Sequence, residues 1–235
     1  LYLNLSSDMY SYAGTVCSDG TVNEQKKEET DNIASPLQKS GEFKFETSLD
    51  NIVNTSGEDN KTAKYTYDYD ENWFFTPSTT YQHELTKMSI RAAMAGYGVM
   101  DAPHSVDTNI KYLMAGNDKN SLEFTNYESS YPDPKTNTIG YAIGSKNIKN
   151  SAGETCSLLM VTVRGGGYMD EWGGNFDLGT KDEHQGFNEA ALQVRDGIKK
   201  YVEKYKDKLP YELKVWISGY SRGAATTNLV AKIVR

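Results

Sequence analysis

Residues 219–223 read Gly-Tyr-Ser-Arg-Gly and carry the spacing G-x-S-x-G. In proteins this spacing is typical of a serine on a sharp turn between a strand and a helix. The flanking sequence predicts that context, because apolar residues alternate over 211–218 and an Ala-rich helical pattern follows to the end of the chain. The turn would hold Ser221 in a strained conformation, with its hydroxyl free to attack an acyl carbon. The alternative is a plain turn of small residues that packs a helix against a strand.

The residues around Ser221 have types that suit such a turn. Gly219 and Gly223 remove the Cβ atoms that would clash where the strand end meets the helix start. The first amides of the helix point at the place where an oxyanion develops during acyl transfer. The backbone N–H of Arg222 is therefore the predicted first oxyanion donor.

A second donor must come from another loop. Residues 164–167 read Arg-Gly-Gly-Gly and directly follow a nearly continuous apolar run at 157–163. Glycine there would let backbone N–H groups approach a substrate oxygen closely. Taken without the serine motif, the same four residues indicate only a turn.

The order of four motifs resembles that of the class 3 lipases, a fungal-lipase-like family of the α/β-hydrolase superfamily. The motifs are Val-Arg-Gly-Gly at 163–166, Trp172, His-Gln-Gly-Phe at 184–187 and the serine motif, and the resemblance covers residues 73–235. It implies a mixed, mostly parallel sheet with flanking helices, incomplete at the C-terminal end. It also implies a carboxylic-ester hydrolase of lipid metabolism, a lipase or esterase that forms an acyl-serine intermediate at Ser221.

The same resemblance implies further site residues. Gly166 would supply the second oxyanion N–H, and Tyr168, Trp172 and Phe176 would form a lid or substrate wall, although the aromatic side chains could also serve ordinary loop packing. Arg222 brings charge where many lipases have an apolar residue, which argues against long-chain triglycerides. The same turn also serves thioesterases and acyltransferases. The chemistry needs no metal or organic cofactor.

A serine nucleophile needs a general base and a carboxylate, which follow it in this superfamily in the order Asp, then His. The 14 residues after Ser221 contain no Asp, Glu or His, and His83, His104 and His184 all precede it. His184 resembles a structural histidine beside the active site. We therefore expect the Asp and His in a missing C-terminal part or a second chain, or else a non-catalytic binding module. A sheet ending here would leave strand 211–218 with one unpaired edge.

The predicted elements leading to the serine motif form a regular series. The spacing of apolar residues predicts helices over 82–97, 106–114 and 186–208. Strands over 138–145 and 157–164 should form an antiparallel hairpin. The second of them, the long helix and strand 211–218 should form a βαβ unit with a parallel strand pair.

Charge divides the chain into two parts. Residues 1–70 carry 13 acidic and 6 basic side chains, whereas residues 71–235 carry 19 of each. We interpret 1–72 as an irregular, acidic, partly β segment with short exposed strands, and 73–235 as a hydrolase domain.

An acidic chain disfavours nucleic acid as a partner, and no apolar run is long enough for a transmembrane helix. The partner expected instead is a small-molecule ester or lipid. The Tyr-, Asn- and Thr-rich front half favours secretion or a bacterial cell surface. A disulfide between Cys17 and Cys156 is an alternative that the sequence leaves undecided.

Overall fold

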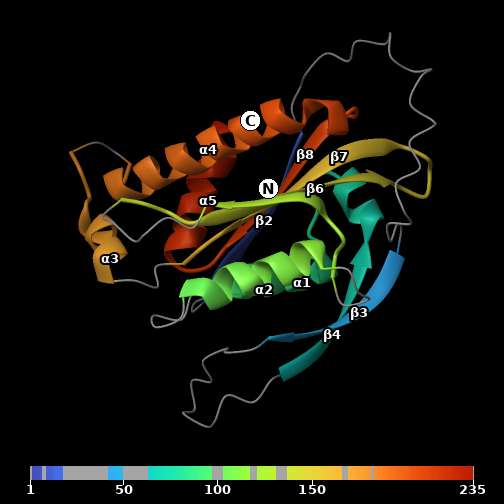
Figure 1. Cartoon of the computed structure of the whole chain (residues 1–235), viewed down its shortest axis with the longest axis horizontal. Coiled ribbons are helices and arrows are strands. Elements are labelled where there is room, and N and C mark those ends of the chain that lie inside the picture. The colour runs from blue at the N-terminus through green and yellow to red at the C-terminus, as the bar shows by residue number, and fades with distance from the viewer. Residues whose placement is uncertain are drawn as a thin grey trace.

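The computed structural model describes residues 2–6, 9–17, 42–49, 63–96, 103–116, 121–130, 137–165, 169–180 and 183–234. Its main sheet has six strands in the order β1-β2-β8-β7-β6-β5. Figure 1 shows this sheet between two layers of helices. The strand bounds are β1 Tyr2–Ser6, β2 Met9–Cys17, β5 Thr125–Ser130, β6 Tyr141–Lys149, β7 Thr155–Val163 and β8 Leu213–Gly219.

The sheet is mixed, as expected for an α/β-hydrolase-type fold, and helices flank it. The prediction of a mostly parallel sheet is wrong for the described strands, because β7–β8 is their one parallel pair and the other neighbours run antiparallel. The cause lies in the connections. A short turn joins β6 to β7 and forces an antiparallel hairpin, whereas a long helix joins β7 to β8 and permits parallel pairing.

Strand β2 corrects a second expectation. It pairs antiparallel with β8, with Gly14 opposite Ile217 and Val16 opposite Val215. The edge of β8 that was expected to be unpaired is thus covered by the N-terminal part of the chain. The β8 edge is therefore no indication of further C-terminal strands. The strand was missed because its Tyr and Ser residues were interpreted as an irregular segment.

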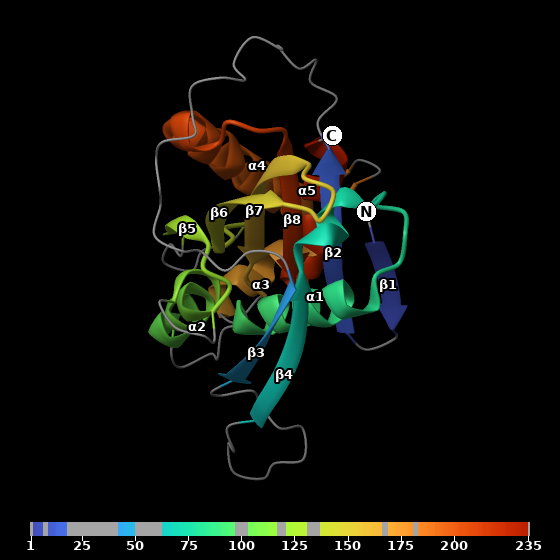
Figure 2. The ribbon, with the colours of Figure 1, turned by 90° about the vertical axis from the view of Figure 1, so that its right-hand side faces the viewer.

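Helices cover both faces of the sheet (Figure 2). On one face lie α4 (Gln185–Tyr205) and α5 (Arg222–Ile233), and on the other lie α1 (His83–Ala95) and α2 (Pro103–Ala115). These helices match the predicted ones within a few residues, and a 3₁₀ turn, η2 (Lys206–Lys208), closes α4. A further helix, α3 (Met169–Phe176), was not predicted because its two glycines and short length suggested a loop.

The side chains of β7 alternate between two hydrophobic cores. Leu158 and Met160 face α1 and α2 together with Trp216, whereas Leu159 and Val161 face α4 and α5. Every residue of β7 after Thr155 is buried. The predicted strand at this apolar run is thus confirmed, and it is covered on both faces.

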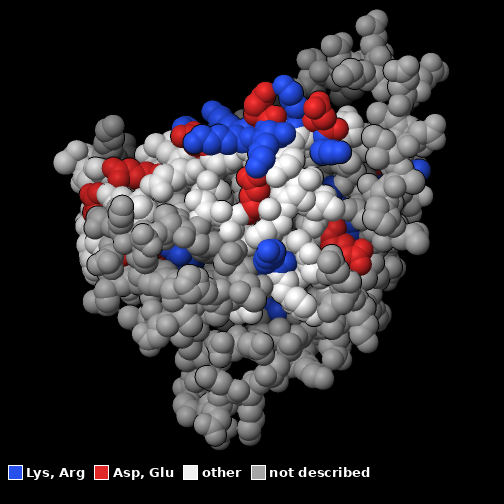
Figure 3. Space-filling view, viewed as in Figure 1, with Lys and Arg blue, Asp and Glu red and all other residues white. Residues whose placement is uncertain are grey.

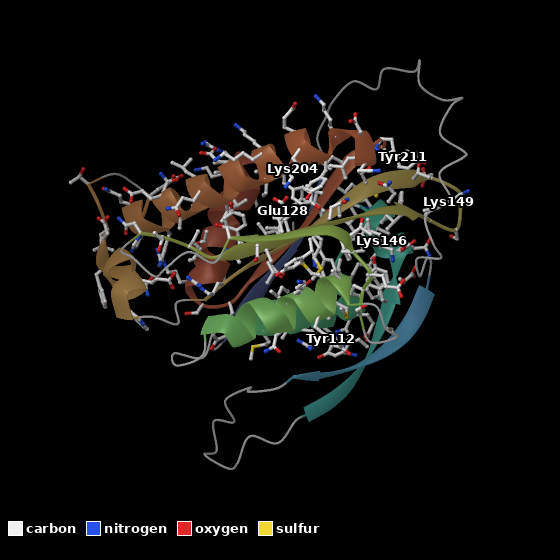
Figure 4. All side chains as sticks on the ribbon, in the orientation of Figure 1. Tyr112, Glu128, Lys146, Lys149, Lys204 and Tyr211 are labelled. Atoms are coloured by element: carbon white, nitrogen blue, oxygen red, sulfur yellow. The ribbon has the colours of Figure 1, made fainter. Side chains whose placement is uncertain are left out.

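Two buried polar contacts fix the α1 side of the sheet. The indole N–H of Trp216 donates a hydrogen bond to the Ser89 hydroxyl of α1 at 2.9 Å. Lys146 of β6 lies 3.2 Å from the Glu71 carboxylate, and both side chains are shielded from solvent. Figure 4 shows Lys146 at the end of the sheet next to the 3₁₀ helix η1 (Glu71–Phe75). Such pairs lock the elements that they join.

A separate two-stranded hairpin consists of β3 (Glu42–Leu49) and β4 (Ala63–Asp70). It matches the alternation of aromatic and polar residues seen in the sequence. Tyr69, however, is fully buried against Phe74 and Trp73, so the expected exposed strand is wrong at this residue. The division of the chain at residue 72 stays a prediction.

The outward face of α4 is charged. Figure 3 shows Lys and Arg side chains gathered along it, interspersed with acidic ones. Lys204 forms an ion pair with Glu128 of β5, and Figure 4 shows this pair bridging helix and sheet. Within the described ranges, the helices do not reach the length and apolar character that a membrane crossing requires.

Candidate active site

Ser221 lies between the end of β8 and the first residue of α5. Its backbone has φ 53° and ψ −120°, a combination that residues with a β-carbon rarely adopt. Such strain costs on the order of 1–3 kcal/mol and persists only where the surrounding structure enforces it. Ser221 is exposed, whereas Gly219 before it and Arg222 after it are buried. The predicted strand–turn–helix is therefore present, with an exposed serine at the turn.

Gly219 and Gly223 allow the turn to close. A β-carbon on Gly219 would lie 2.5 Å from the carbonyl oxygen of Gly223. A β-carbon on Gly223 would lie 2.5 Å from the carbonyl oxygen of Val163, at the end of β7. All these obstacles are backbone atoms, which cannot rotate away. The two glycines are thus required by close approach of the strand ends and the helix start.

The amide of Arg222 lies at the first position of α5, ahead of the hydrogen bonds that close its first turn. The N–H of Gly223 donates to the carbonyl of Tyr220 at 2.8 Å, and the N–H of Ala224 donates to that of Ser221 at 2.9 Å. The amide of Arg222 precedes both. A free amide at a helix N-terminus, beside an exposed serine, can stabilise a negative oxygen.

The segment after β7 lies directly against this turn, as the contact between Val163 and Gly223 requires. Arg164 and Gly165 are buried there. The predicted second donor, Gly166, and the predicted wall residue Tyr168 lie outside the described residues. The structure thus brings Arg164 and Gly165, the start of the glycine-rich loop 164–167, against the turn that carries Ser221. The role of Gly166 stays a prediction.

Trp172 and Phe176 lie on α3 and are exposed, by 43% and 75% respectively. Their rings are 6.3 Å apart at 30°. Since both remain open to solvent, they do not fill a loop core, which weakens the packing alternative. Helix α3 is fixed to the start of α4, because a β-carbon on Gly186 would lie 2.0 Å from the carbonyl oxygen of Gly174.

His184 caps the start of α4 and has a structural role. Its Nδ1 accepts from the N–H of Phe187 at 3.4 Å, and its Nε2 lies 3.0 Å from the carbonyl oxygen of Asn175. The ring also stacks on Phe187. With both ring nitrogens engaged, His184 is poorly suited to take a proton from Ser221. His83 lies at the exposed start of α1, and the side chain of His104 lies outside the described residues.

A buried charge cluster lies beneath α3, and sequence reasoning missed it. Arg164 donates a hydrogen bond to Glu171 of α3, and Arg222 lies close enough for both residues to affect its pKa. Burial lowers the pKa of Arg222, Glu171 raises it and Arg164 lowers it. No sequence signal marked Glu171, because its partners stand 7 and 51 positions away. Among the described residues, no group of three His, Cys, Asp or Glu side chains could hold a metal ion.

The mixed sheet with helices on both faces and the serine on a strand–helix turn are similar to those of the α/β hydrolases. A comparison with protein families narrows the class: residues 161–235 match the family model of Lipase (class 3). This confirms the resemblance for the part of the chain that holds the end of β7, α3, α4, β8 and α5. The match supports a lipase- or esterase-like hydrolase in general. Neither the curated proteins nor the solved structures contain a significant match to this chain.

Proposed function

We propose that this protein is a serine hydrolase that cleaves carboxylic esters through an acyl-serine intermediate at Ser221. One observation carries the proposal: an exposed serine with φ 53° and ψ −120° on a turn whose two glycines admit no β-carbon. Strained residues cluster at functional sites and persist only where the surrounding structure enforces them, as the close approach at Gly219 and Gly223 does here. The family match over residues 161–235 supports the same chemistry.

In the proposed reaction, the Ser221 oxygen attacks the ester carbonyl carbon while its proton passes to a histidine base. The N–H groups of Arg222 and Gly166 would stabilise the negative oxygen of the tetrahedral intermediate. The intermediate then expels the alcohol, which takes the proton from the base, and the acyl-serine remains. Water repeats the sequence, releases the acid and restores the serine.

The histidine that takes the proton from Ser221 has to be located separately. Because all three histidines precede Ser221, against the order in this superfamily, and His184 is engaged at both ring nitrogens, we place the catalytic histidine outside these three. We propose that it and its orienting Asp come from a further part of the protein or from a second chain. The order Ser, Asp, His in this superfamily supports that assignment.

The exposed aromatic residues of α3 support a lipid-like or aryl ester as substrate. Trp172 and Phe176 would form an apolar wall at the entrance, next to the start of the glycine-rich loop. The charge of Arg222 argues against long-chain triglycerides. Thioesters remain an alternative, since the same turn serves both reactions.

The test is turnover by the full-length protein of p-nitrophenyl esters of increasing acyl length, with a matched thioester and amide. Ser221→Ala should reduce kcat by roughly 10⁴-fold or more. Ser129→Ala, which changes an exposed serine on β5, is the matched control and should leave kcat unchanged. Faster cleavage of the thioester would reassign the substrate class. Equal rates for Ser221→Ala and the unchanged protein, or no turnover of any substrate, would refute the proposal.

A further inference from the structure

The cluster beneath α3 contains more positive than negative charge. Arg164, Glu171 and Arg222 are 2%, 0% and 2% exposed, respectively. Arg164 is bound to the single carboxylate of the three. Buried charges in proteins are ordinarily paired, because an uncompensated one is costly to desolvate. Among the described side chains of the cluster, one positive charge is therefore not matched by a carboxylate of its own.

That charge belongs to Arg222. Its Nε, Nη1 and Nη2 atoms are all buried, and none has a hydrogen-bond partner among the described residues. A guanidinium stays protonated in proteins and cannot relieve the cost by losing its proton. Its five N–H groups form a planar fork that fits a carboxylate or a phosphate.

The guanidinium lies directly under α3. Its Nη2 atom is 2.8 Å from the position that a β-carbon on Gly174 would take, and Asn137 Oδ1 is 2.7 Å from the same point. Any larger residue at position 174 would therefore displace it. Figure 1 shows α3 at the end of the sheet where α5 begins. The charged group is thus enclosed between the α3 cover and the residue that follows Ser221.

We propose that Arg222 selects esters that carry a negative charge, by binding a carboxylate or phosphate group of the substrate beneath α3. This inference rests on the proposed function and names its substrate class. A substrate anion would supply the hydrogen-bond partner that this guanidinium does not find among the described residues. A bidentate pair would also orient the ester relative to the adjacent Ser221.

The kinetic test compares substrates that differ only in charge. One is the mono-4-nitrophenyl ester of glutarate, with a free carboxylate, and the other is its methyl ester, with none. Dibutyroylglycerol with and without a 3-phosphate forms the second pair and distinguishes a phosphate from a carboxylate. The unchanged protein should prefer the charged member of at least one pair by roughly 10-fold or more in kcat/KM, as a charge-assisted hydrogen bond predicts.

Arg222→Met should abolish that preference, mainly through KM for the charged ester, and Arg222→Lys should restore part of it. Arg195→Met removes a positive charge from the surface of α4 and should keep the preference. If Arg222→Met lowers kcat/KM for both members of each pair equally, the inference fails although ester hydrolysis stands. The inference fails likewise if the unchanged protein prefers the neutral esters.

A binding measurement separates this inference from the proposed function and from a folding defect. Monomethyl glutarate should raise the Tm of the unchanged protein, whereas dimethyl glutarate should not. Arg222→Lys, which retains the charge, should show a smaller shift. Equal shifts for the two compounds, or none, would overturn the inference even in a protein that hydrolyses no ester.

Discussion

Replacing Gly223 by alanine perturbs the turn at its tightest point. The new β-carbon would lie 2.5 Å from the carbonyl oxygen of Val163 and 2.7 Å from that of Arg164. Relief requires the end of β7 and the start of α5 to separate by several tenths of an ångström. Such overpacking costs about 1–3 kcal/mol, which exceeds the gain of up to about 1 kcal/mol from alanine in a helix. Net destabilisation is therefore expected.

The turnover rate should fall as well, because the displaced turn carries Ser221. A shift of about 1 Å in a reacting group can reduce a rate on the order of 10²-fold, so a shift of several tenths of an ångström should reduce turnover by roughly 10-fold. The assays are urea unfolding and the rate of p-nitrophenyl ester turnover. Gly153→Ala is the control: it lies at φ 89° in the turn at the opposite end of β7, and its β-carbon would meet only Lys149 Cε, at 3.7 Å. It should lose about 1–2 kcal/mol from backbone strain and keep full activity. A Gly223→Ala protein with unchanged stability and turnover would refute the close-approach argument.

Three further predictions concern polar side-chain contacts that stabilise the fold. Ser89→Ala leaves the indole N–H of Trp216 without its acceptor and should lower the free energy of unfolding by about 1–3 kcal/mol in urea. Glu71→Gln removes the carboxylate beside buried Lys146 and should lower the free energy of unfolding by about 3–5 kcal/mol. An unchanged Tm would contradict this prediction. A hydrogen bond from its α4 lysine lowers the pKa of Glu128, so Glu128→Gln should lose a small stability that is present at pH 7 and disappears as pH falls below about 4. A difference that grows in acid would contradict that sign.

The local parts of the site could be predicted from the sequence. The glycines around Ser221 and the alternation in β8 act over a few residues, so their spacing determines the turn. The apolar run of β7 and the long amphipathic pattern of α4 likewise indicate elements that the structure contains. Periodicity records which face each element buries, and that information is local.

The remaining features depend on contacts between distant residues. Strand β2 pairs with β8, which lies about 200 residues further along the chain, and nothing in the sequence of β2 identifies β8 as its partner. The ion pair between Arg164 and Glu171 forms only because α3 folds over the end of β7. The burial of the Arg222 guanidinium without a hydrogen-bond partner among the described residues is likewise a property of packing, which composition and spacing do not encode.

The most direct test of the central claim is covalent labelling of the full-length protein with a fluorophosphonate probe, followed by mass spectrometry of the peptide that contains Ser221. An activated serine should carry the phosphonyl group in the native protein and lose this reactivity on unfolding in urea. The account predicts one modified residue, Ser221, with no label in Ser221→Ala. An unlabelled native Ser221, or equal labelling of native and unfolded protein, would contradict it.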